Sequence, residues 1–359
     1  MTDATTSPAA TPEPIRLGLN TFGDVTADAQ GHLLSQAQSI RNIVDEAVLA
    51  DQVGLDYFGI GEHHTEDFPL SAPDVVLGAI ASRTSRIHLG SAVTVLSSDD
   101  PVRVFQRYST LDALSNGRAE VILGRGSSTE SFPLFGFDLA NYNELFEEKV
   151  ELFAELLKEK PVTWSGNTRA ALTNQEVLPR TESGSIPTWI GVGGSPESVI
   201  RTARHGMSLM LAIIGGSAAR FAPFADLFRE ALQQLDMPSR PIGVHSPGHI
   251  ADTDEEAKEQ FWPHYLDVFG RIGRQRGFRE PTRESFEMEV GPHGALYVGS
   301  PETVAKKIVA TLKVLGATRF DLKYAMGGLS HDKLLHNIEL YGTQVAPAVR
   351  TALTKEGLA

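Results

Sequence analysis

The chain has 359 residues, of which 41% are hydrophobic, so it is long enough to form a large domain with a sizeable buried core. Its formal net charge of −13 argues against nucleic acid or an anionic membrane as a partner, because both attract surfaces rich in Lys and Arg. The sequence contains no cysteine and no apolar run of membrane-spanning length, which excludes disulfides, thiolate metal sites, a cysteine nucleophile and a transmembrane helix.

The first 13 residues, MTDATTSPAATPE, lack the basic start and the apolar block of a signal peptide. Their composition predicts a disordered polar tail, and a cytoplasmic location is the default expectation. Residues 14–359 contain no Gly/Ser-rich or Pro-rich linker that would separate two halves. They are therefore predicted to form a single domain.

Strand and helix patterns alternate along this domain. The expected strands are 15–20, 55–60, 86–96, 119–123, 188–192, 208–213, 241–250 and 320–324. The expected helices are about 40–54, 73–83, 101–114, 143–157, 196–205, 218–235, 254–269 and 331–349. This order implies parallel strands joined by crossover helices. Eight pairs favour closure into a (β/α)8 TIM barrel, since a doubly wound sheet usually stops at about five or six strands.

Three segments interrupt the alternation, at about 126–142, 161–187 and 271–314. We interpret them as insertions on the C-terminal rim of the barrel. Their aromatic residues, and one just before the third segment, predict either a mostly apolar substrate pocket or a contact between subunits. These residues are Phe132, Phe135, Phe137, Phe269 and Phe286.

The stretch YFGIGEHHTEDF, residues 57–68, places Glu62, His63 and His64 directly after a buried strand. In a barrel this is the rim where chemistry takes place. A metal site is disfavoured, because consecutive residues of an extended chain point to opposite sides and no third ligand follows at a recognisable spacing. An acid/base or hydrogen-bonding role for one histidine is the preferred reading, and a structural histidine that fixes a loop is the alternative.

Histidines within the strands look less informative. His88 is predicted to be buried and hydrogen-bonded inside the third strand. His245 and His249 lie at even spacing on the seventh strand, and therefore on one face of it. Packing in the core or in the wall of the pocket is the preferred interpretation of both.

The stretch GVGGSPES, residues 191–198, leads from a strand into a helix that begins near Pro196. Gly193 and Gly194 allow backbone N–H groups to approach an anion, and the start of the helix adds partial positive charge. A ligand phosphate is the natural guest near Ser195, and an ordinary tight turn is the alternative.

A second strand end, LGRGSS at residues 123–128, holds Arg125 between Gly124 and Gly126. Its guanidinium is suited to clamp the same phosphate with paired N–H donors. The alternative is a salt bridge on the rim. Because the glycine-rich turn is also present, the joint phosphate site is the better interpretation.

Four motifs resemble the bacterial-luciferase-like flavin-dependent monooxygenases, a family of flavin oxidoreductases. They are GLDYFGIGEHH, SRIHLGSAVTVLSSDDPVRVFQRYSTLDALSNGRAEVILGRGS, IPTWIGVGGSPESV and VGSPETVAKKI. The resemblance runs in the expected order from about residue 15 to the last helix, and 86–126 is its most specific part. It implies a TIM barrel that binds reduced FMN at its C-terminal rim.

The resemblance also implies roles for individual residues. Ala92–Val93 is expected to be a cis peptide bond beneath the flavin ring, with His63 as the catalytic residue beside it. The expected cofactor-binding residues are Asn20, Ala92, Val93, Thr94, Gly124, Arg125, Gly193, Gly194 and Ser195, and no metal is expected. Gly124 replaces a cysteine of luciferase and Gly193 replaces a glutamate. The first change speaks against light emission and the second predicts a phosphate cradle made of backbone groups.

The implied activity is a monooxygenase that uses reduced FMN and O2 to oxygenate a small organic substrate, with the reduced flavin supplied by a separate flavin reductase. His63 would then act as a hydrogen-bond donor or acid/base. Two alternatives stay open: a deazaflavin-dependent oxidoreductase that transfers hydride, and a non-catalytic flavin-binding protein. By analogy with relatives, a homodimer formed through the second and third helices is expected.

Overall fold

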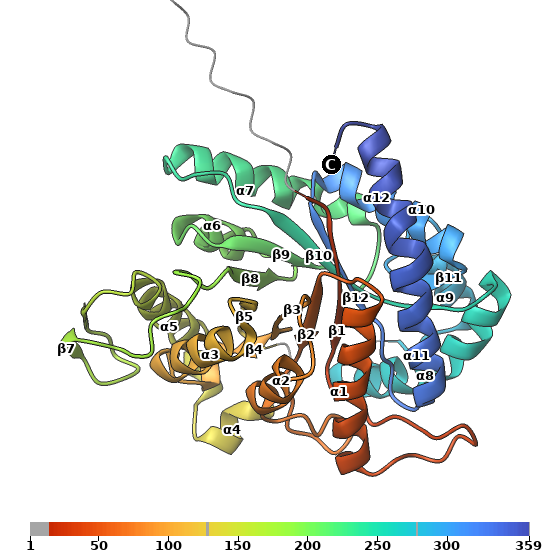
Figure 1. Ribbon diagram of the computed structural model, residues 1–359, viewed down its shortest axis with the longest axis horizontal. Helices are drawn as coiled ribbons and strands as arrows, with labels where there is room; N and C mark the ends of the chain where they lie inside the picture. The colour runs from red at the N-terminus through yellow and green to blue at the C-terminus, as the bar shows by residue number, and fades with distance from the viewer. Residues whose placement is uncertain (1–13, 127–128, 278, 359) are drawn as a thin grey trace, which may run out of the picture.

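The structure of the chain is a computed structural model that describes residues 14–126, 129–277 and 279–358. The tail expected at residues 1–13 lies outside the described residues. In the part that is described, parallel strands form a closed barrel at the centre and helices surround it (Figure 1). The predicted (β/α)8 TIM barrel is confirmed.

The barrel strands pair in the order β1, β2, β3, β5, β8, β9, β10, β12, and β12 pairs with β1 to close the ring. Their bounds are β1 (Arg16–Thr21), β2 (Tyr57–Ile60), β3 (His88–Ser91), β5 (Ala119–Gly124), β8 (Thr188–Val192), β9 (Ser208–Ala212), β10 (Ile242–Ile250) and β12 (Arg319–Lys323). All of these pairings are parallel. Carboxyl ends therefore gather at one mouth of the barrel, as the sequence predicted.

The surrounding helices begin where the sequence provides start signals. Their bounds are α1 (Gln36–Gln52), α2 (Pro73–Ala81), α3 (Pro101–Ser115), α5 (Tyr142–Leu156), α6 (Pro196–Arg204), α7 (Ala222–Gln234), α10 (Pro301–Leu315), α11 (His331–Leu340) and α12 (Ala346–Lys355). α2, α3, α6 and α10 carry proline at the first helical position, where its missing N–H is not needed. Asp100, Ser195 and Ser300 cap α3, α6 and α10 through their side chains.

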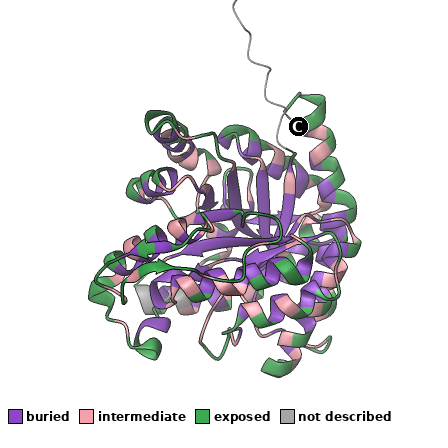
Figure 2. Ribbon diagram, turned by 60° about the vertical axis from the view of Figure 1, so that its left-hand side comes forward, coloured by how far each residue is buried: buried purple, intermediate pink, exposed green. Residues whose placement is uncertain are grey.

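Burial follows this two-layer design (Figure 2). Strand positions that point outward, such as Leu17, Leu89 and Phe320, are buried against the inner faces of the helices in one continuous core. Outer helix faces are exposed. No helix in the described part of the chain combines the length and the apolar character that crossing a membrane requires.

The strand predicted at 86–96 is divided in two. β3 ends at Ser91, the Ala92–Val93 peptide bond is cis, and the chain then re-forms as β4 (Thr94–Val95), which pairs with the end of β5. The cis bond lies where the family resemblance implied it. A short 3-10 helix, η1 (Leu96–Ser98), connects β4 to α3.

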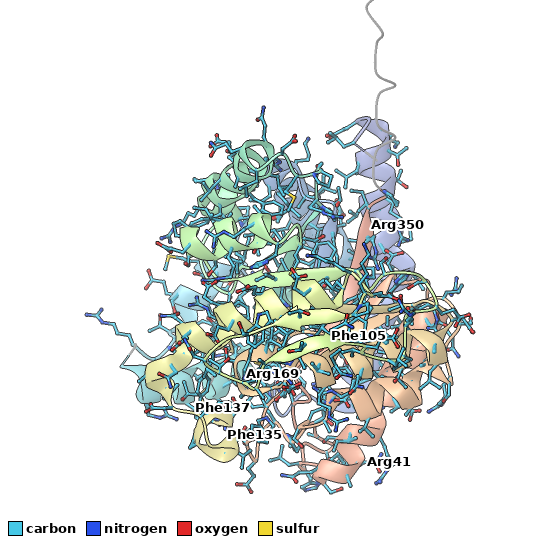
Figure 3. The ribbon with its side chains drawn as sticks, turned by 90° about the vertical axis from the view of Figure 1, so that its left-hand side faces the viewer. Arg41, Phe105, Phe135, Phe137, Arg169 and Arg350 are labelled. Atoms are coloured by element: carbon cyan, nitrogen blue, oxygen red, sulfur yellow. The ribbon has the colours of Figure 1, made fainter. Side chains whose placement is uncertain are left out.

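The three interruptions differ in where they lie. The first contains α4 (Ser131–Phe135) and η2 (Leu139–Asn141), between β5 and α5, and Figure 3 shows Phe135 and Phe137 close together on it. The second forms a hairpin of β6 (Val162–Trp164) and β7 (Leu172–Gln175). It leaves α5 and enters β8, and its hydrogen bonds run to α3 and α5. It therefore lies along the flank of the helical layer rather than over the rim.

The helix predicted at 254–269 is longer than the sequence indicated, because α8 (Asp254–Arg276) continues into the third interruption. It is followed by α9 (Arg283–Val290) and by β11 (Tyr297–Gly299), which extends the sheet beside β10. Lys307 of α10 fastens this segment, because its amine donates to the backbone carbonyls of Glu289, Val290, Gly291 and Leu296 at 2.6–3.2 Å.

Candidate active site

The inside of the barrel is packed with large side chains at one end, called the filled end, and is lined by several small residues at the other, called the mouth. Near the amino ends of the strands, Tyr57, Ile122, Trp189 and Met210 pack together around Arg319. Nearer the carboxyl ends, several inward positions carry little or no side chain. These positions are Gly59, Gly61, Ala92, Gly124, Gly191 and Ala212. The wall of the mouth, here called the cup, is therefore largely backbone, and Asn20, Phe22 and Val93 lie against three of its glycines.

Val93 is the largest apolar side chain at the cis bulge. A Cβ added to Gly124 would lie 2.5 Å from Val93, and one added to Gly191 would lie 3.3 Å from it. The glycines of β5 and β8 therefore make room for this side chain. The hydroxyl of Thr94 lies 3.3 Å from that of Tyr108 on α3, within the helical layer.

The two predicted phosphate grips meet in space. β5 and β8 are neighbouring strands, so Arg125 and the turn at 193–195 leave the barrel side by side. Arg125 Nη2 lies 3.4 Å from Ser198 Oγ in the first turn of α6, and its Nη1 donates to Asn143 Oδ1 at 2.9 Å. Gly194 has a φ of +113°, a conformation that favours glycine. An Arg, free backbone amides and a helix start converge on one corner.

A second guanidinium, which the sequence analysis missed, supports this corner. Arg201 is buried, donates to Ser198 Oγ at 3.1 Å from Nη1, and pairs with Glu147. Since Arg125 and Arg201 both donate to the same hydroxyl oxygen, the hydroxyl hydrogen of Ser198 points away from both and is free to donate. Glu197 accepts from Ser195 Oγ at 2.6 Å, a hydrogen bond that lowers the pKa of this exposed carboxyl.

His63 lies on another part of the rim, directly after β2, which β3 separates from β5. Its Nδ1 is 2.7 Å from Glu130 Oε1, and its ring lies between Phe22 and Phe68 at centroid distances of 5.4 and 5.1 Å. Burial raises the pKa of the Glu130 carboxyl, but the hydrogen bond from His63, a backbone hydrogen bond and the nearby His63 and His64 together outweigh it and leave this pKa lowered. The pair is an imidazole whose orientation is fixed by an ionised carboxylate.

His64 has different partners from His63. Its Nε2 lies 2.9 Å from Glu62 Oε1, and its ring meets the edge of Phe135 at 5.1 Å. Burial raises the pKa of Glu62, against the hydrogen bond from His64. Within the described ranges, no group of three His, Asp or Glu side chains is arranged to hold a metal ion.

A comparison with known protein families identifies the family of this chain. The family model described as luciferase-like monooxygenase matches residues 21–319. The chain belongs to the luciferase-like monooxygenase family. The resemblance stated from the motifs is thereby confirmed.

Individual members of the luciferase-like family show how far the similarity extends. The N-acetyl-S-alkylcysteine monooxygenase of Bacillus subtilis (strain 168) is 30% identical over 294 residues, which cover 76% of this chain and 83% of that protein. Two solved structures share the fold. The oxygenating constituent of 3,6-diketocamphane monooxygenase from Pseudomonas putida, a type II Baeyer–Villiger monooxygenase in complex with FMN, has a TM-score of 0.75 at 20% identity, over 93% of this chain and 98% of that one. The coenzyme F420-dependent tetrahydromethanopterin reductase of Methanopyrus kandleri has a TM-score of 0.71 at 19% identity, over 93% and 99%.

Among the residues predicted for the site of this luciferase-like protein, Asn20 has the most unusual surroundings. Its side chain is buried, and its Nδ2 lies 2.8 Å from Nδ1 of His245 and 3.5 Å from Oδ2 of Asp321. Its Oδ1 is sealed from solvent without a hydrogen-bond partner. From the sequence, His245 was expected to pack in the core or in the wall of the pocket. In the structure it lies inside the barrel near the mouth.

Proposed function

We propose that this chain is a flavin-dependent monooxygenase that uses reduced FMN and O2 to oxygenate a small organic substrate. The observation that carries the proposal is the corner where Arg125 and the turn at 193–195 meet, beside a mouth lined by glycine backbone. Membership in the luciferase-like monooxygenase family supports it. A fold neighbour in complex with FMN and a monooxygenase relative agree with it.

The residues present fit this cofactor. A phosphate suits Arg125, the hydroxyl of Ser198 and the amides at the start of α6. The hydroxyl of Ser195 donates to Glu197, so Ser195 would contribute its backbone amide. A Cβ added to Gly193 would meet nothing within 4 Å, so the turn borders open space. Val93, which packs against Gly124 and Gly191, would offer a planar ring an apolar contact. Ala92, Thr94, Gly124 and Gly194 remain in the proposed cofactor site as parts of the backbone that shapes it.

Reduced FMN, when bound, supplies the electrons that allow O2 to react. The chain's own contribution is to bind, to exclude water and to hold a proton. Phe22, Phe68 and Val93 give the mouth apolar walls that keep water away from the reacting atoms. Glu130 accepts from Nδ1 of His63, which leaves Nε2 as the ring nitrogen available to exchange a proton. His63 is the proposed acid/base, since Nε2 can take up and return a proton.

Two other functions are considered: the first has specific support and the second is disfavoured. A deazaflavin-dependent hydride-transfer oxidoreductase is supported by the reductase neighbour, whose TM-score of 0.71 is close to the 0.75 of the FMN complex. The same phosphate corner would serve either cofactor. A non-catalytic flavin-binding protein would keep Arg125 but would not need the His63–Glu130 pair, which argues for catalysis.

The direct test is a titration of the purified protein with FMN, reduced FMN and a deazaflavin, followed by absorbance and fluorescence. We expect FMN to bind with a micromolar or lower Kd and the deazaflavin to bind at least about tenfold more weakly, a difference of about 1.4 kcal/mol. With a flavin reductase as partner, we expect oxygen uptake to increase when a substrate is added. Preference for the deazaflavin without oxygen uptake would instead establish hydride transfer. A His63→Ala variant that keeps both FMN binding and turnover would favour the non-catalytic role.

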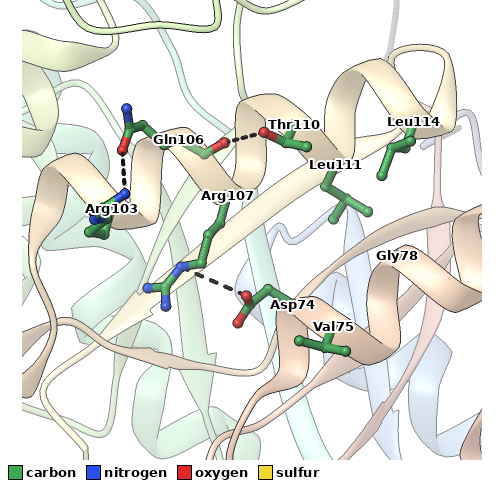
Figure 4. A pocket seen from close by; sticks show the side chains of 9 residues that line it. All are labelled: Asp74, Val75, Gly78, Arg103, Gln106, Arg107, Thr110, Leu111 and Leu114. Carbon is green, nitrogen blue, oxygen red and sulfur yellow. Dashed lines mark hydrogen bonds and ion pairs between the residues drawn. The ribbon is translucent and has the colours of Figure 1, made fainter.

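A homodimer is proposed for the face formed by α2 and α3. A groove of about 380 Å³ lies between these helices, where Arg107 and Asp74 face each other across it (Figure 4). Its apolar side chains are strongly exposed, with Val75 at 70% and Leu114 at 60%. Gly78 adds no side chain, so another helix could approach closely. Large apolar side chains at such exposure are typical of a covered surface.

Val75→Glu combined with Leu114→Glu is expected to convert a dimer into a monomer. A two-fold interface carries each substitution twice, so the dimer Kd should rise by at least about a hundredfold. Light scattering after size-exclusion chromatography measures the change. Leu235→Glu, at another exposed leucine near the end of α7, is the matched control and should leave the mass unchanged. A wild-type monomer at high concentration would contradict the proposal.

A further inference from the structure

His245 combines burial with an unusual hydrogen bond. It lies on β10 opposite Asp321 of β12, and the alternation of the strands directs both side chains into the barrel. Only 8% of His245 is exposed. Its ring stacks on Phe22 at 5.8 Å, and Asn20 Nδ2 lies 2.8 Å from its Nδ1. The question is which of the two groups donates.

The surroundings of Asn20 answer it. The amide group that faces His245 is also 3.5 Å from Oδ2 of Asp321. Both oxygens of Asp321 already accept from Arg319, at 2.7–3.1 Å. An amide oxygen placed there would face another acceptor, whereas an amide nitrogen faces two acceptors. The nitrogen of Asn20 therefore points to His245 and donates to Nδ1.

An imidazole that accepts at Nδ1 carries its proton at Nε2. Burial lowers the pKa of His245 to about 4, and Lys323 on β12 adds to this effect. The ring is therefore neutral near pH 7, with a fixed tautomer. His63 differs from His245 in that its Nδ1 donates, to Glu130.

The Nε2–H group of His245 is not used inside the protein. Among the residues that the structure describes, it has no hydrogen-bond partner, yet it is not among the polar atoms sealed from solvent. His249, on the same strand, is different. Its Nε2 bonds to Gln260 of α8 at 2.8 Å and its Nδ1 is sealed, so it belongs to the packing between β10 and α8. His245 alone of the two keeps a free donor.

We propose that His245 is a neutral N–H donor of the active-site mouth, held in this tautomer by Asn20, and that it binds a carbonyl oxygen of the group in the mouth. β9 separates β10 from β8, so His245 lies outside the phosphate corner of β5 and β8 and its donor is left for another part of the bound group. The oxygen belongs to the flavin ring or to the substrate. The identity of this ligand rests on the proposed function. Asn20 is then a positioning residue that acts through His245.

The tautomer is tested without any ligand by NMR of protein labelled with 15N-histidine. One neutral Nε2–H ring should persist from about pH 5.5 to about pH 8, and its signals should disappear in His245→Gln. Asn20→Asp should convert it to a doubly protonated ring, because a carboxylate accepts from Nδ1–H. A proton on Nδ1 of His245 in the wild-type protein, or a charged ring at neutral pH, would overturn the proposal.

The ligand is tested by FMN titration and by the steady-state constants for substrate. If the oxygen belongs to the flavin, His245→Leu should raise the FMN Kd by about tenfold, and His245→Gln, which restores an N–H donor, should recover most of this loss. If it belongs to the substrate, the FMN Kd stays constant and KM rises by a similar factor in the leucine variant. His249→Gln is the control for a buried histidine on the same strand.

The results distinguish a failure of the donor role of His245 from a failure of the proposed function. Unchanged FMN Kd, KM and kcat in both His245 variants would overturn the donor role while the proposed function stands. A wild-type protein that shows the expected tautomer but binds no FMN would overturn the proposed function and leave the assignment of the proton supported. His245→Gln keeps a polar side chain of similar reach, so it also serves if the leucine variant does not fold.

Discussion

Arg319→Met is expected to lower the free energy of unfolding by about 3–5 kcal/mol. Arg319 is fully buried inside the barrel, where Nη1 donates to Glu120 at 2.7 Å and Nη2 donates to Asp321 at 2.7 Å. Its guanidinium also stacks on Tyr57 at 3.8 Å and on Trp189 at 4.7 Å. Methionine fills a similar volume but leaves two buried carboxylates without their shared cation. Urea unfolding at neutral pH measures the loss.

Acidification should narrow the difference between Arg319→Met and the wild-type protein. Burial raises the pKa of Glu120, but Arg319 and Arg16 outweigh it and hold this pKa well below its usual range. A lowered native pKa contributes stability above the unfolded-state pKa of about 4.3, and this contribution is lost as the pH falls. The Arg319→Met variant lacks most of this contribution from Glu120. Its free energy of unfolding should therefore approach that of the wild type below about pH 5.

Two further variants separate buried charge from lost packing. Adding Glu120→Gln to Arg319→Met removes one unpaired carboxylate, so it should recover part of the stability. Arg350→Met is the matched control: Arg350, labelled in Figure 3, is partly exposed and bonds Asp56 at 2.7 Å. Its loss should cost less than about 1 kcal/mol. If Arg319→Met cost no more than this control, the buried network would not be what stabilises the barrel.

Periodicity in the sequence was sufficient to predict the barrel, because each strand and helix carries its own local signal. β8 begins and ends where predicted, and α6 starts at the expected proline. The strand ends were predictable for the same reason, since parallel strands bring their carboxyl ends together whatever the distance along the chain. Arg125 and the turn at 193–195 could therefore be assigned to one site. The cis bond at Ala92–Val93 came from the family resemblance and from no local pattern.

The partners of the site residues were not predictable in this way. Glu130 contacts His63 across 67 positions of sequence, and His245 contacts Asn20 across 225. No spacing rule links such residues, because their meeting depends on how an insertion folds or on which strands are adjacent. Arg201 does sit one helical turn after Ser198, an i, i+3 spacing that could have been read. The path of 161–187 along the flank depends on side-chain contacts with α3 and α5 that periodicity does not show.

The two ends of the barrel interior differ in how their charged side chains are paired. The filled end pairs Glu120 and Asp321 with Arg319 and Arg16, so its charged groups already have partners within the protein. At the mouth, Arg125 pairs with no carboxylate among the described residues and contacts only neutral groups, Asn143, Ser198 and the ring of Tyr142. Arg125 adds to the lowering of the pKa of Glu197, which comes mainly from the Ser195 hydrogen bond, but forms no ion pair with it in the described part of the chain. The guanidinium is therefore available to an incoming anion.

Arg125→Met is accordingly expected to weaken FMN binding by about 10- to 100-fold, since hydrogen bonds to a charged group contribute about 1.5–3 kcal/mol. The loss is expected because Arg125 would donate hydrogen bonds to the phosphate of FMN. The amides of residues 193–195 and the start of α6 remain, so binding is weakened rather than abolished. Fluorescence titration with FMN at fixed ionic strength measures the change, and the slope of affinity against salt should also decrease.

Riboflavin, which has the same ring but no phosphate, shows whether Arg125 acts where we place it. Its Kd should be the same in the wild type and in Arg125→Met, because the ring meets the cup and not the corner. Arg204→Met is the matched control: it removes an equal charge from the exposed last turn of the same helix α6 and should leave FMN affinity within about twofold. If Arg125→Met weakened both flavins equally, the residue would support the fold of the mouth rather than hold a phosphate. If it weakened neither, the anion corner would not be the cofactor site, and the proposed function would lose the observation that carries it.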